Sequence, residues 1–181
     1  MRKTALRALA VLMGALPAAA ADLPTFRVGI LNDQSGLYAD IAGPGSVEAA
    51  KMAVEEFGGK VLDAPIEVVS ADHQNKADIA ASKAREWMDQ QGLDVLIGGT
   101  NSATALAMNK VAQEKKRVYI NIGAGTARLT NEECSPYTVH YAYDTVALAK
   151  GTGSAVVKQG GKKWFFLTAD YAFGYSLEEN T

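Results

Sequence analysis

The sequence predicts an open, doubly wound α/β fold, and three observations lead to this prediction. Short apolar runs alternate along the chain with segments whose apolar residues recur every three or four positions. Within each run the residues are mostly apolar and do not alternate with polar ones. This pattern is typical of strands in a parallel sheet whose two faces are both buried. With 48% hydrophobic and 21% charged residues, the 181-residue chain has the composition of a soluble globular protein, not that of a disordered or collagen-like one.

The first two strand–helix units occupy the first half of the chain. Residues 26–31 (FRVGIL) predict a strand, and the helix that follows it ends at Gly58–Gly59. The apolar stripe of this helix consists of Val47, Ala50, Val54 and Phe57. Pro65 opens a second strand (66–72, IEVVSAD), and a second helix stops at Gly92. Its apolar face consists of Ala80, Ala84, Trp87 and Met88.

The third and fourth strands continue the same cycle. Residues 93–98 (LDVLIG) predict a strand, residues 102–116 a helix, and residues 118–122 the next strand. The apolar face of this helix consists of Ala103, Leu106, Ala107 and Val111. Helices between successive buried strands indicate right-handed crossovers, so we expect a parallel sheet with helices on both faces.

After Gly123 the pattern is less regular. The alternation in residues 137–143 (YTVHYAY) predicts a strand, and a helix follows it with the apolar residues Ala147, Leu148 and Val156. Residues 162–168 (KKWFFLT) predict another buried strand, and residues 177–180 the first turn of a helix. A last strand without neighbours would leave its edges unpaired. We therefore expect the chain to be a C-terminally truncated fragment of a longer protein.

The N-terminus has the pattern of a secretory signal peptide (residues 1–21). Three basic residues, Arg2, Lys3 and Arg7, precede the apolar run 8–16, and small residues follow it. A membrane-spanning helix needs about 20 apolar residues, which this segment lacks. We expect cleavage after Ala20 or Ala21 and release of a soluble protein into the bacterial periplasm.

Composition excludes several classes of function. The formal net charge of −2 gives no basic surface for a nucleic-acid backbone. One cysteine and two histidines are too few for the usual zinc sites, so we expect neither a metal nor a cofactor. Residues 123–128 lack the last glycine of a dinucleotide-binding motif, and neither a phosphate-binding loop nor a nucleophile elbow is present. Catalysis is therefore not expected.

Cys134 is expected to be structural. It lies in a polar loop with no histidine within a few residues, whereas a catalytic cysteine needs a positioned base. An odd cysteine in an exported protein usually has a partner, so we expect a disulfide to a cysteine beyond residue 181.

Small and polar residues follow three of the predicted strands, in residues 32–38 (NDQSGLY), 98–102 (GGTNS) and 123–126 (GAGT). Ligands of open parallel sheets bind outside the carboxyl ends of the strands. The helix after the second loop has Asn101 or Ser102 as its N-cap, and its free N–H groups can hold a carboxylate. The alternative is that these residues only cap the helix and permit tight turns. Three such loops at one sheet edge favour a binding site.

These segments resemble one protein family. Five segments occur in the order and spacing of the periplasmic solute-binding proteins of ABC importers of the leucine-isoleucine-valine-binding type. They are the leader, VGILNDQSGLYADIAGPG, LIGGTNSATALA, INIGAGTARLT and FFLTADYAFG. The resemblance implies a type I periplasmic-binding-protein fold, with an open parallel sheet in each of two lobes. It implies that residues 22–143 form most of the first lobe and that residues 144–181 form the exit from the hinge and the start of the second.

The resemblance also implies a binding site and partners. The residues that it assigns to the solute are Tyr38, Asn101, Ser102, Ala124, Gly125, Thr126, Tyr171 and Phe173. It implies a monomer that binds a small carboxylate-bearing solute, such as a branched-chain or other amino acid or an aromatic acid, and delivers it unchanged to the membrane subunits of an ABC permease. The alternatives are the ligand-binding domain of a sensor or receptor and a secreted α/β enzyme.

Overall fold

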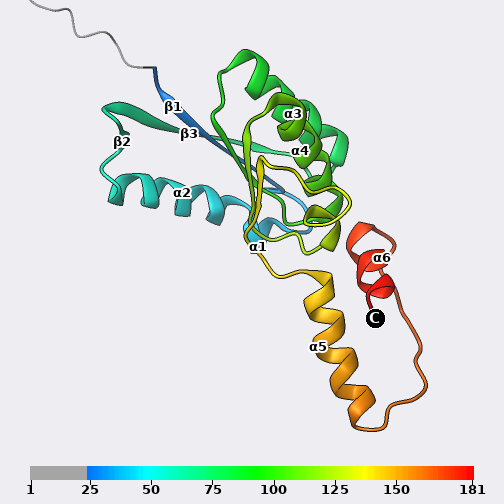
Figure 1. Ribbon diagram of the computed structural model, residues 1–181. Helices are drawn as coiled ribbons and strands as arrows, with labels where there is room; N and C mark the ends of the chain where they lie inside the picture. Colours follow the sequence, from blue (N-terminus) through cyan, green and yellow to red (C-terminus); the bar gives the residue numbers. More distant parts are fainter. Residues whose placement is uncertain (1–23) are drawn as a thin grey trace, which may run out of the picture.

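The protein, described here by a computed structural model, is defined for residues 24–181 (Figure 1). The predicted signal peptide and its cleavage positions lie outside these residues. The described chain contains strands β1 (Phe26–Asn32), β2 (Lys60–Val61), β3 (Ala64–Asp72), β4 (Val95–Gly98), β5 (Val118–Asn121) and β6 (Thr138–His140). Its helices are α1 (Ala39–Ala42), α2 (Pro44–Glu56), α3 (Ala77–Gln90), α4 (Ser102–Lys115), the 3-10 helix η1 (Ala127–Leu129), α5 (Thr145–Lys158) and α6 (Ala172–Glu179).

The strands form one sheet in the order β2-β3-β1-β4-β5-β6. All neighbouring pairs are parallel except β2 and β3, which form a short antiparallel hairpin. The first described strand, β1, lies inside the sheet, and the chain winds outward from it in both directions. The predicted open, doubly wound α/β fold is thus confirmed, together with the strands expected between residues 26 and 122.

The main core lies between the sheet and helices α3 and α4. Leu31, Leu96 and Tyr119 project from three neighbouring strands onto this face and are fully buried. From the helices they meet Ala84, Trp87, Met88, Met108 and Val111. A Cβ on Gly29 would lie 2.8 Å from the side chains of both Trp87 and Leu93, so glycine at this point of β1 allows α3 to pack closely on the strand.

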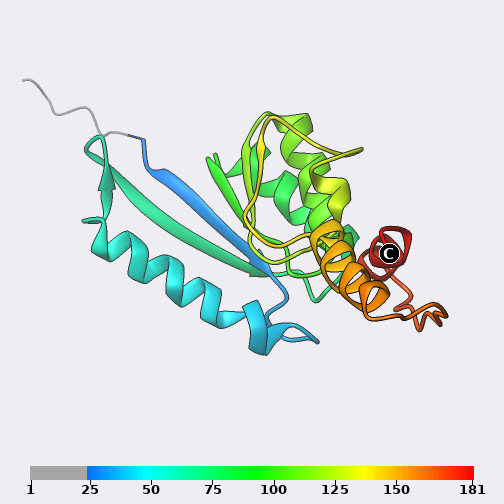
Figure 2. The same cartoon turned by 60° about the horizontal axis from the view of Figure 1, so that its bottom comes forward.

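Helix α2 lies on the opposite face of the sheet, against β1 and β3 (Figure 2). Its apolar stripe is only half-buried, and Val118 and Val139, which project to the same face, remain exposed. The expectation that Phe57 belongs to the buried stripe is wrong, since its residue surface is 68% exposed. Phe57 is the C-cap of α2, where the chain turns away through Gly58 and Gly59, both of which have a positive φ. Among residues 24–181, no helix is long and apolar enough to span a membrane.

The structure corrects two expectations for the last third of the chain. The strand predicted over residues 162–168 joins no sheet, because no other described strand pairs with it; these residues form an extended segment between α5 and α6. The helix expected from Leu177 begins earlier, at Ala172. Its first turn contains Gly174, and because glycine has a low helix propensity, the start of the helix was not predicted from the sequence.

We predict that Gly98→Ala destabilises the fold by about 1–3 kcal/mol, the usual cost of overpacking. A Cβ at this position would overlap the carbonyl oxygen of Leu31 in the adjacent strand, and a backbone atom cannot move aside without separating β1 from β4. The measurement is the free energy of unfolding from urea titration.

Gly151→Ala is the matched control. Gly151 lies inside α5 with no atom within 4 Å of an added Cβ, so this change should leave stability unchanged or raise it by up to about 1 kcal/mol. Equal stability of the Gly98→Ala variant and the unmodified chain would contradict the close packing of β1 on β4.

Candidate functional site

A cavity of about 430 Å³ opens at the carboxyl ends of the parallel strands. Loops after β1, β4 and β5 form one side of it, and the segment around the start of α6 forms the other. The residues that line it are Tyr38, Ile41, Ala42, Ser46, Thr100, Ile122, Gly123, Gly125, Tyr143, Tyr171 and Phe173. More than half are aromatic or glycine, and none of these side chains carries a charge at neutral pH.

Two aromatic residues from opposite sides of the cavity meet across it. The hydroxyl of Tyr38 donates a hydrogen bond of 3.4 Å to the hydroxyl of Tyr171, which precedes α6. The ring of Phe173 lies 6.1 Å from that of Tyr171, measured between centroids. Partial burial raises the pKa of Tyr171, and its phenol is neutral at physiological pH. The cavity is thus closed on this side by neutral aromatic groups.

Gly125 lies where the rings of Tyr143 and Phe173 converge. A Cβ on Gly125 would lie 2.8 Å from a ring carbon of Tyr143 and 3.0 Å from one of Phe173, closer than such contacts normally allow. Because glycine leaves this space free, both rings approach the loop that follows β5. The same loop is joined to the start of α5 by a 2.8 Å hydrogen bond from the Thr145 amide to the Gly125 carbonyl.

Thr100 supplies a polar group with no internal partner. Its Oγ1 is buried and has no hydrogen-bond partner within the described part of the chain, and the residue lines the cavity. A buried hydroxyl without a partner is unfavourable, whereas a solute with a hydrogen-bonding group would satisfy it. Thr100 directly precedes Asn101, the N-cap of α4, so this hydroxyl lies beside the positive end of a 14-residue helix.

Buried asparagines at the ends of β1 and β5 hold the loops in place. The Asn32 side chain donates to the Ala42 carbonyl at 2.8 Å and accepts from the Gly99 amide at 3.1 Å. The Asn121 side chain donates to the Ala124 carbonyl at 2.7 Å and accepts from the amide of the same residue at 3.2 Å. Each asparagine fixes both a donor and an acceptor of the backbone beside the cavity.

The predicted site residues fall into two groups. Tyr38, Gly125, Tyr171 and Phe173 line the cavity. The other predicted residues, Asn101, Ser102, Ala124 and Thr126, are buried and are not among the lining residues. They form the layer behind it.

Three hydrogen bonds and the burial of Ala124 define this layer. Asn101 accepts from the Ala103 amide at 2.7 Å, and Thr126 accepts from the Arg128 amide at 3.4 Å, so both act as caps. The hydroxyl of Ser102 accepts from the Thr126 amide at 3.3 Å and thereby connects the two loops.

Several lining residues were not among those predicted. Tyr143, the last residue of the strand predicted over residues 137–143, is exposed and lines the cavity. Thr100 and Gly123 belong to the strand-end loops that the sequence singled out, and their position next to the predicted residues is the signal that could have identified them. Ile41 and Ser46 belong to α1 and α2, outside the three strand-end loops that the sequence analysis singled out.

Two aspartates and a histidine shape the loop that carries Tyr38. Asp33 accepts from the amides of Gly36 and Tyr38 at 2.8 and 3.0 Å. Partial burial opposes ionisation of Asp72, but hydrogen bonds from Ser35, Gln34 and Gln74 hold its pKa below the ordinary value. His73 is buried beside both carboxylates; burial lowers its pKa, and the charges of Asp33 and Asp72 oppose this shift.

Comparisons with known proteins agree with this geometry. A profile of the family described as periplasmic binding protein matches residues 25–181. The chain is similar to a periplasmic binding protein from Burkholderia mallei, with 76% identity over 86% of this chain and 42% of that one and a TM-score of 0.83. No curated protein sequence matches it.

Two further solved structures are similar over the same shares, 86% of this chain and 42% of theirs. One is a branched chain amino acid ABC transporter periplasmic ligand-binding protein from Burkholderia xenovorans, with 38% identity and a TM-score of 0.75. The other is a solute binding protein of an ABC transporter from Rhodopseudomonas palustris in complex with 3,4-dihydroxybenzoic acid, with 29% identity and a TM-score of 0.75. The chain thus spans less than half the length of these relatives.

We predict that His73 makes the stability of the fold depend on pH. The unfolded state, with an ordinary histidine pKa of about 6.5, binds a proton more tightly than the folded state. The free energy of unfolding should therefore fall as the pH drops from about 7 towards the lowered pKa of His73, by at most about 1.4 kcal/mol per pH unit. The loss stops below that pKa, where both states are protonated.

Urea titration over a series of pH values measures this dependence. His73→Gln should abolish it, whereas His140→Gln, which changes the only other histidine, should retain it. The contribution of Asp72 to the free energy of unfolding is lost only at lower pH, below about 4, and does not interfere with the dependence due to His73. If the free energy of unfolding changed with pH in the same way in the unmodified chain and in the His73→Gln variant, the assignment of this pH dependence to His73 would be contradicted.

Proposed function

We propose, from the premise that this chain belongs to the periplasmic binding protein family, that it binds a small carboxylate-bearing solute for an ABC importer. The solute lies in the cavity at the carboxyl ends of β1, β4 and β5. The observation that carries this proposal is the buried, unpartnered hydroxyl of Thr100 in an otherwise uncharged, aromatic cavity beside the N-terminus of α4. A carboxylate satisfies this hydroxyl, and the helix end stabilises its charge.

The aromatic lining supports solutes with an apolar body. Tyr38, Tyr143, Tyr171 and Phe173 offer ring faces and edges that pack equally well on the side chain of a branched-chain amino acid or on an aromatic acid. The relatives include a protein named for branched-chain amino acids and one bound to 3,4-dihydroxybenzoic acid. We accordingly propose an amino acid or an aromatic acid as the solute.

We assign a supporting role to Asn101, Ser102, Ala124 and Thr126. The hydrogen bond between Ser102 and the Thr126 amide ties the start of α4 to the loop that contains Gly125. Loss of this connection would let the loops after β4 and β5 move apart and would misplace Thr100. Ser102 therefore acts on the solute through the backbone that lines the cavity.

The arrangement of the cavity supports a division into two lobes. Residues 22–143 form most of the first lobe, and residues 144–181 form the hinge exit and the start of the second. The lining residues support this division, because most belong to the first part while Tyr171 and Phe173 belong to the second. Closure of the second part over the first would bury the solute.

We further propose that the protein is exported to the periplasm through its N-terminal signal. There it hands the solute unchanged to the permease. The family contains binding proteins, and the transfer requires no chemistry in this chain.

We predict that the chain prefers acids to their amides. Leucine or 4-hydroxybenzoate should bind at least about tenfold more tightly than leucinamide or 4-hydroxybenzamide, because a hydrogen bond to a charged group contributes about 1.5–3 kcal/mol. Since Ile41 and Tyr143 leave the cavity exposed, the dissociation constant should be near 1 mM, about −4 kcal/mol. Ligand-detected NMR titration measures both.

Thr100→Val keeps the shape of the side chain and removes its hydroxyl, so it should abolish most of the preference for the acid. Thr130→Val, which changes an exposed threonine away from the cavity, is the matched control and should retain it. Equal binding of acid and amide in the unmodified chain would contradict the proposal. Turnover of any of these compounds would favour a secreted enzyme.

A further inference from the structure

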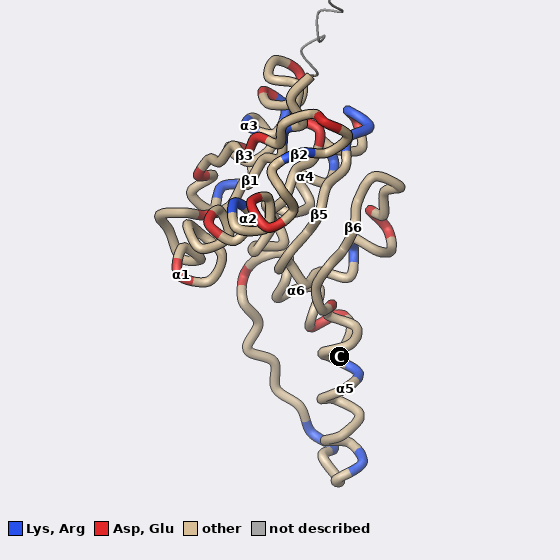
Figure 3. The backbone as a smooth tube through the Cα atoms, turned by 90° about the vertical axis from the view of Figure 1, so that its left-hand side faces the viewer, with Lys and Arg blue, Asp and Glu red and all other residues tan. Residues whose placement is uncertain are grey.

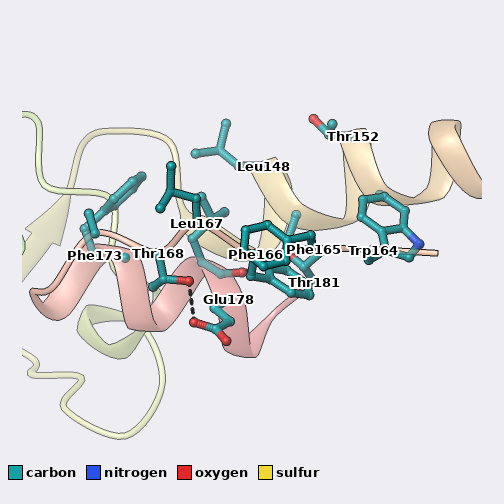
Figure 4. Close-up of a pocket in the computed structure, with 15 residues that line it drawn as sticks. Leu148, Thr152, Trp164, Phe165, Phe166, Leu167, Thr168, Phe173, Glu178 and Thr181 are labelled. Atoms are coloured by element: carbon teal, nitrogen blue, oxygen red, sulfur yellow. Dashed lines mark hydrogen bonds between the residues drawn. The ribbon is translucent and has the colours of Figure 1, made fainter.

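Helix α6 holds aromatic side chains at the strand-end cavity, the cavity at the carboxyl ends of β1, β4 and β5. The helix lies next to α4, whereas α5 extends away from the sheet (Figures 1 and 3). Tyr171 precedes α6 and Phe173 lies in its first turn, and both line the strand-end cavity. Phe173 also borders an apolar cavity of about 530 Å³ between α5 and α6, where Figure 4 shows it at one end. The position of α6 therefore decides where these rings lie.

The direct contact of α6 with the first part of the chain is small and apolar. Ala172 packs on a buried cluster that consists of Ala105, Leu106, Ala124 and Leu129. Within the described chain, no group of α6 forms a direct hydrogen bond to residues 24–143. The polar connection between α6 and the strand-end loops runs instead through the start of α5.

Thr145, the first residue of α5, makes this connection. Its hydroxyl accepts a 3.1 Å hydrogen bond from the Ala127 amide and shares a 2.8 Å hydrogen bond with the hydroxyl of Ser176 in α6. Its own amide donates to the Gly125 carbonyl at 2.8 Å. Asn180, just after α6, donates to the Thr145 hydroxyl at 3.5 Å. One residue is thus bound to the loop after β5 on one side and to α6 on the other.

The two hydroxyls that meet here are buried. Thr145 is fully buried and Ser176 is 3% exposed. A buried hydroxyl that loses its partner has no water to replace it, so this connection is more costly to break than one at the surface. Ser176 follows Phe173 by three residues in the same helix, and residues at this spacing are neighbours on the helix surface. Holding Ser176 therefore also holds the base of the Phe173 side chain.

We propose that Thr145 is a positioning residue for solute binding, an inference that rests on the proposed function. Its hydroxyl holds Ser176, and with it the ring of Phe173, at a fixed distance from Gly125. A Cβ on Gly125 would lie 3.0 Å from that ring, so the ring lies directly over the loop. Thr145 is not among the residues that line the cavity, and it acts on the solute only through these neighbours. It thereby determines the affinity for solutes that pack on Phe173.

The first test needs no solute. One α-proton of Gly125 points toward the rings of Phe173 and Tyr143, so its NMR chemical shift reports the positions of the rings in the unliganded chain. Thr145→Val keeps the shape of the side chain and removes the hydroxyl. It should move the Gly125 signal toward its value in a Phe173→Leu variant. Thr145→Ser retains the hydroxyl and should leave the signal near that of the unmodified chain.

Two further variants separate this role from a general loss of stability. Ser176→Ala breaks the same connection from the side of α6 and should displace the Gly125 signal in the same direction. Because both changes remove one contact, the double variant with Thr145→Val should be no more displaced than Thr145→Val alone. Thr168→Val is the matched control, since its hydroxyl donates to Glu178 of α6 but does not join the helix to the strand-end loops (Figure 4). It should leave the Gly125 signal unchanged, and circular dichroism confirms that each variant is folded.

Titration with 4-hydroxybenzoate and separately with leucine then tests the role in binding. For each compound that the unmodified chain binds, Thr145→Val and Ser176→Ala should weaken binding by about three- to tenfold, the range expected for one hydrogen bond. Thr145→Ser and Thr168→Val should bind as the unmodified chain does.

Three results would overturn the proposal. One is a Gly125 signal that is the same in Thr145→Val as in the unmodified chain, because Phe173 would then be held without the hydroxyl. The second is a Thr145→Ser variant displaced as far as Thr145→Val. The third is a displaced signal with unchanged solute affinity, which would make the connection structural only. If the unmodified chain binds neither compound, the proposed function fails, whereas the Gly125 signal still decides whether Thr145 positions Phe173.

Discussion

The site depends on the side chain of Asn32, which is fully buried at the carboxyl end of β1. Its donor group binds the Ala42 carbonyl at the end of α1, and its acceptor binds the Gly99 amide after β4. One amide group thus connects the end of β1 both with the end of α1 and with the loop after β4. Gly99 has a φ of 90°, and this turn places Thr100 at the cavity. Without this connection, the strands would still form a sheet, but their loops would not converge on the cavity.

The fold was largely predictable because hydrophobic periodicity reports burial. The strands at residues 26–31 and 66–72 and the helix with Trp87 and Met88 lie where the sequence indicated. The end of β1 is fully buried, and one face of the helix packs on the core. The strand at residues 162–168 was predicted for the same reason and is not part of any sheet. Strand propensity is a local property, whereas a sheet requires a partner that the described chain does not provide. The hairpin strand β2 is too short to give a periodic signal.

The site was predictable as a place but only in part as a set of residues. The carboxyl ends of parallel strands identify the edge, and glycines and small polar residues mark the loops. Whether Thr100, Asn101 or Ser102 lines the cavity depends on the turn at Gly99, which sequence spacing does not specify. The structure has Asn101 and Ser102 engaged with backbone amides and leaves Thr100 free. Tyr143 escaped prediction because an aromatic residue after a strand is equally typical of a core.

The central claim is that the solute binds at the strand-end cavity and not in the larger apolar cavity between α5 and α6. Amide NMR spectra of the isotopically labelled chain, recorded during titration with 4-hydroxybenzoate and separately with leucine, test this claim most directly. The account predicts that at least one of the two shifts the amide signals of Tyr38, Thr100, Gly123 and Gly125 along one saturable curve. Shifts confined to residues such as Leu148, Thr152 and Leu177, which line the other cavity, would contradict it.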